Sequence, residues 1–91
     1  MSKILQDVNV GMGLSKARLK VGLTQEAACA KMATHGRPMS QSHLANIEQG
    51  RRNIFVSDMI VLSRIYKTTI SEFFEGLDPI SRDTKDTGPK E

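Results

Sequence analysis

The sequence predicts a single all-α domain of five helices, and three observations support this fold class. The chain has 91 residues, which is enough for one hydrophobic core and too few for two. Hydrophobic residues make up 38% and aromatic residues only 4%, and Val, Ile and Thr never alternate with polar residues over a strand's length. Stretches with helical spacing are instead separated by glycines, prolines and capping residues. We expect residues 1–9 to be a lead-in, 10–76 the folded domain and 77–91 a flexible tail.

The first predicted helix precedes Gly22 and shows the i, i+3, i+4, i+7 spacing of one buried face. Gly22 supplies its end, while Gly11 and Gly13 leave its start undefined because glycine weakens a helix interior. We therefore interpret the stretch from Gly11 to Gly13 as a flexible entry to the helix. The positions with this spacing are Leu14, Ala17, Arg18 and Val21.

The second predicted helix runs from Gln25 to about Ala33. Thr24 is a suitable N-cap, and Glu26 places a negative charge in the first turn, where the helix dipole favours it. Most residues in its middle are alanines, so another helix can approach it closely. Gly36 and Pro38 cannot continue a helix, because the residue before a proline avoids the α region. A loop therefore follows this helix.

Ser40 caps a third predicted helix, Gln41–Gln49. Leu44, Ile47 and Glu48 share one face of it. The opposite face carries neutral hydrogen-bonding groups of modest length, whereas a merely solvated helix face more often carries Lys and Glu. Such groups suit the base edges of DNA, and two short helices joined by a turn place the second one in a major groove. The residues on or beside this face are Gln41, Ser42, His43, Asn46 and Gln49.

Two more helices are predicted after a polar loop at residues 51–53. The fourth helix runs from about residue 57 to 66, with Met59, Leu62, Ile65 and Tyr66 on its apolar side. The sequence Thr69-Ile70-Ser71-Glu72 fits a capping box, which opens a short fifth helix that ends near residue 76.

Arg18 and Glu48 each interrupt the apolar stripe of their own helix. A buried charge without a partner would cost several kcal/mol, so two such charges favour an ion pair between the first and third helices. The alternative is that both side chains extend to water. Pairing would fix the orientation of the third helix.

Charge is unevenly placed along the chain, whose formal net charge is +3. Residues 31–53 contain four Lys or Arg and one Glu, which suggests a polyanionic partner, although an ordinary solvated surface explains the charge equally well. The single cysteine, Cys29, excludes a disulfide framework and favours a reducing compartment. No apolar run has the length of a signal-peptide core or a membrane span. We expect a cytoplasmic protein with no membrane partner.

Few residues could support metal binding or catalysis. Cys29, His35 and His43 include no close pair and lack a fourth ligand, so a small buried thiol and two surface histidines are the simpler interpretation. Cys29 lies among alanines with nothing to activate it as a nucleophile. Gly11-Met12-Gly13 lacks the third glycine and the preceding strand of a dinucleotide loop. The sequence therefore predicts neither an enzyme nor a metal or cofactor.

In their order along the chain, these motifs resemble the Cro/C1-type (Xre-family) helix-turn-helix domain of phage repressors and bacterial regulators. The likeness spans residues 14–74, about two thirds of the chain, and no single piece would be specific. It implies a lambda-repressor-like domain of five helices. The matching pieces are Leu14-Ser15-Lys16-Ala17-Arg18, Gly22-Leu23-Thr24-Gln25-Glu26-Ala27-Ala28, Ser40-Gln41-Ser42-His43-Leu44-Ala45-Asn46-Ile47-Glu48-Gln49-Gly50-Arg51-Arg52 and Thr69-Ile70-Ser71-Glu72-Phe73-Phe74.

The resemblance implies a role for each matching position. The base-reading positions would be Gln41, Ser42 and Asn46, with His43 as a base or phosphate contact. Gln25 would contact a phosphate and brace Gln41. Contacts to the DNA backbone set register and salt-dependent affinity, while base contacts set sequence choice. The backbone contacts after the third helix would be Arg51, Arg52 and Asn53, and the family's internal ion pair would be Arg18 with Glu48.

The chain departs from the family pattern ahead of the third helix, where residues 33–39 form an enlarged loop. Arg37 could reach a phosphate from this loop, or the loop could change how the third helix is presented. The usual Pro-Ser before the fourth helix is replaced by Ile54-Phe55, which leaves the start of that helix less defined.

The predicted function is that of a sequence-specific regulator of transcription that binds double-stranded DNA. We expect a repressor that binds a palindromic operator as a homodimer through its fourth and fifth helices. The alternative is an antitoxin or another protein-interaction module, with its partner on the same C-terminal helices. The core could be completed by Ile54, Phe55, Phe73, Phe74 and Leu77, or some of these residues could form an apolar patch for such a partner.

Overall fold

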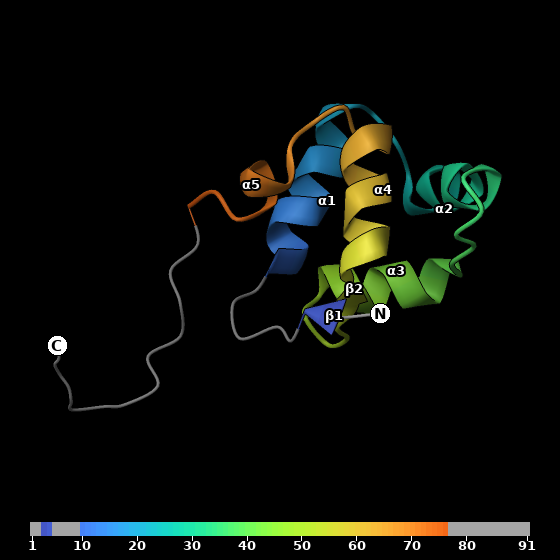
Figure 1. Ribbon diagram of the computed structural model, residues 1–91, viewed down its shortest axis with the longest axis horizontal. Helices are drawn as coiled ribbons and strands as arrows, with labels where there is room; N and C mark the ends of the chain where they lie inside the picture. The colour runs from blue at the N-terminus through green and yellow to red at the C-terminus, as the bar shows by residue number, and fades with distance from the viewer. Residues whose placement is uncertain (1–2, 5–9, 77–91) are drawn as a thin grey trace, which may run out of the picture.

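The computed structural model describes residues 3–4 and 10–76, so the predicted tail and most of the predicted lead-in lie outside the described residues. Five helices confirm the all-α fold class (Figure 1). One short antiparallel strand pair accompanies them, with Lys3 opposite Phe55 and Ile4 opposite Ile54. The elements are β1 (Lys3–Ile4), α1 (Val10–Lys20), α2 (Gln25–Thr34), α3 (Gln41–Glu48), β2 (Ile54–Phe55), α4 (Val56–Ile65) and α5 (Ile70–Phe73).

Three helix starts lie where the capping residues predicted them. The Thr24 hydroxyl accepts a hydrogen bond from the Ala27 backbone N–H at 3.0 Å, and the Ser40 hydroxyl accepts one from the His43 N–H at 3.1 Å. At α5, Thr69 and the N3 residue Glu72 form the predicted capping box. Each cap satisfies backbone donors that the first turn of a helix leaves without an intrahelical partner.

The start of α4 differs from the prediction. Helical geometry begins at Val56, one residue earlier than expected, and Phe55 at its N-cap makes no side-chain capping bond. Phe55 instead belongs to β2, which pairs with β1 from the other end of the chain. No sequence pattern predicts this pairing, because two residues are too few to show strand alternation.

The interpretation of Gly11 and Gly13 as a flexible entry is wrong. Both lie inside α1, and both allow close backbone approach. A Cβ at Gly11 would lie 2.6 Å from the carbonyl carbon of Glu48 and closer still to the backbone oxygens beside it. A Cβ at Gly13 would lie 2.6 Å from the carbonyl carbon of Phe73. Glycine therefore allows α1 to pack directly on the backbones of α3 and α5.

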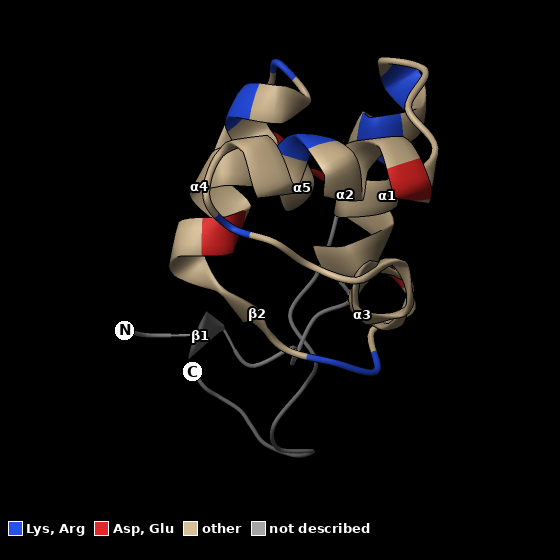
Figure 2. Ribbon diagram, turned by 90° about the vertical axis from the view of Figure 1, so that its right-hand side faces the viewer, with Lys and Arg blue, Asp and Glu red and all other residues tan. Residues whose placement is uncertain are grey.

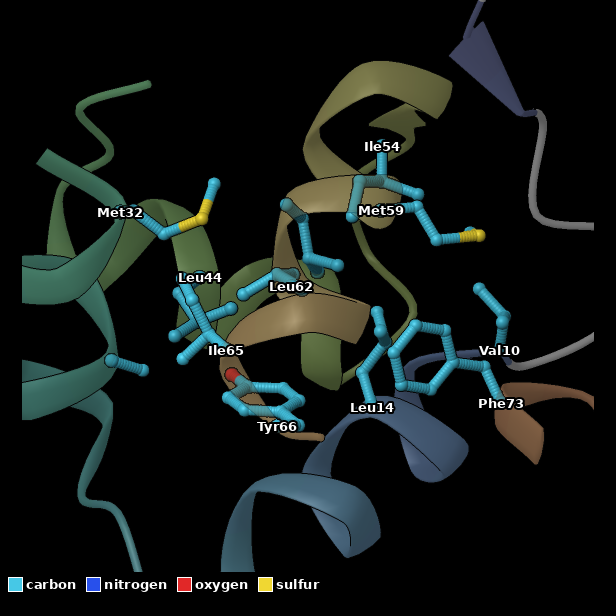
Figure 3. Close-up of a cluster of buried hydrophobic side chains, with 12 residues drawn as sticks. Val10, Leu14, Met32, Leu44, Ile54, Met59, Leu62, Ile65, Tyr66 and Phe73 are labelled. Atoms are coloured by element: carbon cyan, nitrogen blue, oxygen red, sulfur yellow. The ribbon is translucent and has the colours of Figure 1, made fainter. Parts of the chain in front are cut away.

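One cluster of apolar side chains forms the core, with members from every helix and from β2 (Figure 3). Tyr66 and Phe73 meet edge to face, with ring centroids 6.4 Å apart. Val21, predicted on the buried stripe of the first helix, lies after the end of α1 and is 38% exposed. The core residues are Val10, Leu14, Ala28, Met32, Leu44, Ile47, Ile54, Met59, Leu62, Ile65, Tyr66 and Phe73.

The arrangement leaves α3 at one end of the molecule. In Figure 1, α3 runs across the lower end of the bundle, below α4, with α2 to its upper right. It packs against α1 and α2, and its buried residues are Leu44, Ile47 and Glu48. Within the part of the chain that the structure describes, each helix is too short or too polar to cross a membrane.

Candidate nucleic-acid interface

The outer face of α3 is open to solvent. Leu44 and Ile47 are fully buried on its inner face, which anchors the helix to the core. On the outer side, Gln41, Ser42 and Gln49 are exposed, and His43 and Asn46 are half-buried. The helix therefore presents amides, a hydroxyl and an imidazole to the outside. Side-chain groups of this kind form hydrogen bonds with base edges in a DNA major groove.

Asn46 and Ser42 are linked within this face. Asn46 Nδ2 donates a hydrogen bond to the Ser42 carbonyl oxygen at 2.9 Å. The second amide hydrogen and Oδ1 of Asn46 are not used by that bond, and these two groups are what asparagine offers to adenine. The internal bond holds the amide against the helix, so less rotamer entropy is lost on binding.

Arg18 of α1 and Glu48 of α3 form a two-pronged ion pair. Arg18 Nε donates to Glu48 Oε2 at 2.8 Å, and Arg18 Nη2 donates to Glu48 Oε1 at 3.0 Å. The two side chains are only 10% and 5% exposed. Hydrogen bonding to Glu48 raises the pKa of Arg18 further, against the lowering effect of burial. Paired and bidentate geometry is what allows two charges to be buried at a helix contact.

The Arg18–Glu48 pair also forms hydrogen bonds with residues at and just before the start of α2. Arg18 Nη1 donates to the Leu23 carbonyl at 2.7 Å, just before α2 begins. Gln25 Nε2 donates to Glu48 Oε1 at 2.9 Å. The Gln25 amide thus braces the buried carboxylate, which is a charged acceptor, and the expected contact between Gln25 and Gln41 stays a prediction. One ion pair thus fixes α1, α2 and α3 relative to one another.

Arg37 lies in the enlarged loop and contacts α4. Its Nε donates to Asp58 Oδ1 at 2.8 Å, and the two side chains are 31% and 11% exposed. We expected Arg37 to reach a DNA phosphate, but the structure gives its guanidinium an internal partner that holds the loop against α4. Arg37 therefore stabilises the fold beside α3, and the expected contact of Arg37 with a DNA phosphate stays a prediction.

The loop after α3 supplies positive charge at the same end of the molecule. Arg51 and Arg52 are exposed, and Asn53 is half-buried. Figure 2 shows this basic segment between α3 and β2. Together with His43, these residues bring two guanidinium groups, an amide and an imidazole next to the amide-rich face of α3.

Sequence reasoning missed Asp58, although the chain carried a signal for it. Asp58 precedes Leu62 by four positions and Ile65 by seven, so it lies on the stripe that faces the core. It is 92% buried from solvent and needs a partner there, which Arg37 supplies. An acidic residue in a buried stripe was the same signal that pointed to Glu48.

The described residues contain no group of three His, Cys, Asp or Glu side chains arranged to hold a metal ion. Cys29 is a half-buried free thiol on α2. Burial raises the pKa of Cys29, and the charge on Glu48 raises it further, so the reactive thiolate is disfavoured.

One comparison with known proteins gives a match. A protein family described as helix-turn-helix matches residues 14–73 of the chain. The match begins within α1 and ends with the last residue of α5. It therefore contains α2, α3 and the loop with Arg37 that joins them. No significant match was found among curated proteins or solved structures.

Proposed function

Since the chain belongs to the Cro/C1-type (Xre) helix-turn-helix family of DNA-binding transcription regulators, we propose that it is a repressor that binds a palindromic operator as a homodimer. The observation that carries this proposal is the solvent-facing side of α3, which presents amides and a hydroxyl where a surface helix ordinarily presents Lys and Glu. The Arg18–Glu48 ion pair supports it, because a helix that reads bases must be held in a fixed orientation.

The proposed contacts divide by position on α3 and around it. Gln41, Ser42 and Asn46 read base edges. The exposure of Gln41 and Ser42 and the shared face of Ser42 and Asn46, four positions apart, support this role. Contacts to phosphates set the register of the helix in the groove and supply salt-dependent affinity. The phosphate contacts are proposed for Arg51, Arg52 and Asn53 after α3 and for Gln25 at the start of α2.

The first test compares two variants across a salt series. Gln41→Ala should lose roughly 1–3 kcal/mol of discrimination at one base position while binding other sequences as before. Arg52→Ala is its matched control: it should weaken binding to all duplexes and reduce the salt slope by about one unit. Operator binding measured by fluorescence anisotropy separates the two effects. If both variants bind every duplex as the unmodified chain does, the proposed face is wrong.

The homodimer is proposed to join through α4 and α5. Val61 on α4, Ile70 on α5 and Phe74 at the C-cap of α5 are half-buried apolar residues, and a second copy could cover the rest of their surface. Met12 and Leu19 on α1 are exposed by 60% and 63%, so α1 is the competing location for a partner.

Selection of bound duplexes from a random pool tests the dimer and its operator together. We expect the recovered sites to be inverted repeats, because a two-fold symmetric dimer reads the same bases twice. Sedimentation equilibrium on the same protein should give twice the chain mass. Recovery of single, asymmetric sites by a monomer would contradict the dimer and leave the DNA-binding assignment intact.

A further inference from the structure

The connection from α2 to α3 has few attachments to the rest of the fold. α2 ends at Thr34 and α3 begins at Gln41. Between them, only Arg37 and Met39 are half-buried, and the other residues are exposed. Met39 packs against the core, and Arg37 forms the ion pair with Asp58 of α4. In Figure 2 the connection passes α4 on its way to α3. These two side chains therefore hold the chain immediately ahead of α3.

Asp58 is a firm point of attachment for this connection. It lies in the first turn of α4, where the helix dipole favours a negative charge, and its side chain is 11% exposed. The next residue, Met59, is fully buried in the core. Arg37 Nε donates to Asp58 Oδ1 at 2.8 Å, and hydrogen bonds between charged groups are the strong ones. The pair therefore joins the connection to a part of α4 that the core holds in place.

Asp58 also lies near the N-terminal end of α3. A cavity of about 250 Å³ is lined both by Asp58 and by His43, the third residue of α3. The rest of its lining comes from the loop after α3 and from β2. Open space, rather than packed side chains, therefore lies between the start of α3 and α4 on this side. The Arg37–Asp58 pair supplies a polar link from α4 to the chain that leads into α3.

An ion pair thus acts near each end of α3. At the C-terminal end, Arg18 binds Glu48, the last residue of the helix. At the other end, Arg37 lies four positions ahead of the first residue and binds Asp58. The eight residues of α3 span about 12 Å. One attachment fixes the position of a rod of this length, and a second attachment fixes its direction. The first two residues of α3, which are proposed to read bases, lie at the end that the Arg37–Asp58 pair holds.

We propose that Arg37 and Asp58 are positioning residues for sequence recognition: their ion pair sets the direction of α3 in the major groove and thereby the choice of bases by Gln41 and Ser42. This inference rests on the proposed function and makes it more specific. Side chains that read bases must be held within about 0.5 Å of a productive geometry. Contacts to phosphates carry no sequence information and come from long, flexible side chains. Loss of the pair therefore lowers discrimination between sequences more than it lowers affinity for DNA as such.

The test measures a ratio of two affinities. One duplex is the sequence that the unmodified chain recovers from the random pool, and the other is a scrambled duplex of the same length and base composition. A variant that is partly unfolded loses affinity for both duplexes by the same factor, so the ratio reports positioning and not stability. In fluorescence anisotropy titrations, Asp58→Ala should lower the ratio by about tenfold, which is the size of one lost base contact.

Charge alone predicts a different result for Asp58→Ala. The substitution removes a negative charge near the DNA-facing end of the molecule, so electrostatics alone would raise the affinity for both duplexes and leave the ratio unchanged. Arg37→Ala tests the same pair from its more exposed side, and it carries the test if Asp58→Ala does not fold. It should lower the ratio by a similar factor, and the double variant should lower it no further, because both residues act through one contact.

Ser63→Ala is the matched control. Ser63 lies on α4 and is 8% exposed, as Asp58 is, and its hydroxyl donates to the Ile60 carbonyl of the same helix at 2.6 Å. Its replacement should leave the ratio unchanged. If Arg37 acts only by contacting a phosphate, Arg37→Ala would weaken binding to both duplexes equally and the positioning role would be overturned.

Two further outcomes would contradict the inference. An equal loss of the ratio in Ser63→Ala, or an unchanged ratio in both Asp58→Ala and Arg37→Ala, would overturn the positioning role and leave the proposed regulator standing. Failure of the pool selection to recover any duplex would overturn both.

Discussion

Replacing Glu48 with alanine should lower the free energy of unfolding by about 3–5 kcal/mol, because the change leaves Arg18 buried without its counter-ion. Three hydrogen bonds end on this carboxylate, two from Arg18 and one from Gln25. A buried guanidinium that loses its acceptors keeps its desolvation cost and loses its compensation. Urea denaturation followed by circular dichroism measures the loss.

The controls distinguish the cost of an unpaired buried charge from the cost of the lost side-chain volume. A double replacement, Arg18→Met with Glu48→Met, should recover most of the stability, since apolar residues of similar size can replace a buried pair at little cost. Arg37→Ala should cost less than Glu48→Ala, because the Arg37–Asp58 pair, with side chains 31% and 11% exposed, is screened by water more than the Arg18–Glu48 pair, with side chains 10% and 5% exposed. A Glu48→Ala transition midpoint equal to that of the unmodified chain would show that the buried pair contributes nothing.

Replacing Gly13 with alanine should destabilise the fold by about 1–3 kcal/mol or more. In an ordinary helix interior the same change stabilises by roughly 0.5–1 kcal/mol, so the expected sign is reversed. The new methyl group would meet the Phe73 backbone of α5, and backbone atoms cannot rotate away as the end of a side chain can. Thermal and urea unfolding of the variant measure the change.

Met12→Ala is the control for this prediction. Met12 occupies the adjacent position of α1 and is 60% exposed, so its truncation should change stability by no more than about 0.5 kcal/mol. A Gly13→Ala variant more stable than the unmodified chain would mean that α5 moves aside without cost, and that its contact with α1 is not tight.

The helices and their internal ion pair were accessible from sequence because local chemistry determines them. Thr24, Ser40 and Thr69 each precede a helix that needs an acceptor for its first N–H groups, and all three serve as caps. Arg18 and Glu48 were recognisable since each breaks an apolar stripe, and a charge in such a position needs a partner. The structure brings these two together.

Other features depend on distances that no local pattern records. Gly13 looks like a helix breaker in sequence, and only its position against Phe73 shows why a side chain is excluded there. The strand pair of β1 and β2 joins residues about fifty positions apart through two-residue segments. The ion pair between Arg37 and Asp58 joins residues 21 positions apart, so the charge of Arg37 is visible in the sequence and its partner on α4 is not.

The contacts of α1 also bear on the spacing of a DNA site. Gly11 meets α3 and Gly13 meets α5, and two steps along a helix turn the chain by about 200°, so the two neighbours lie on opposite sides of α1. Backbone touches backbone at both places, which leaves little freedom to repack. In a dimer joined through α5, the distance between the two copies of α3 would then be fixed. Half-sites moved by one base pair would be displaced and rotated out of reach.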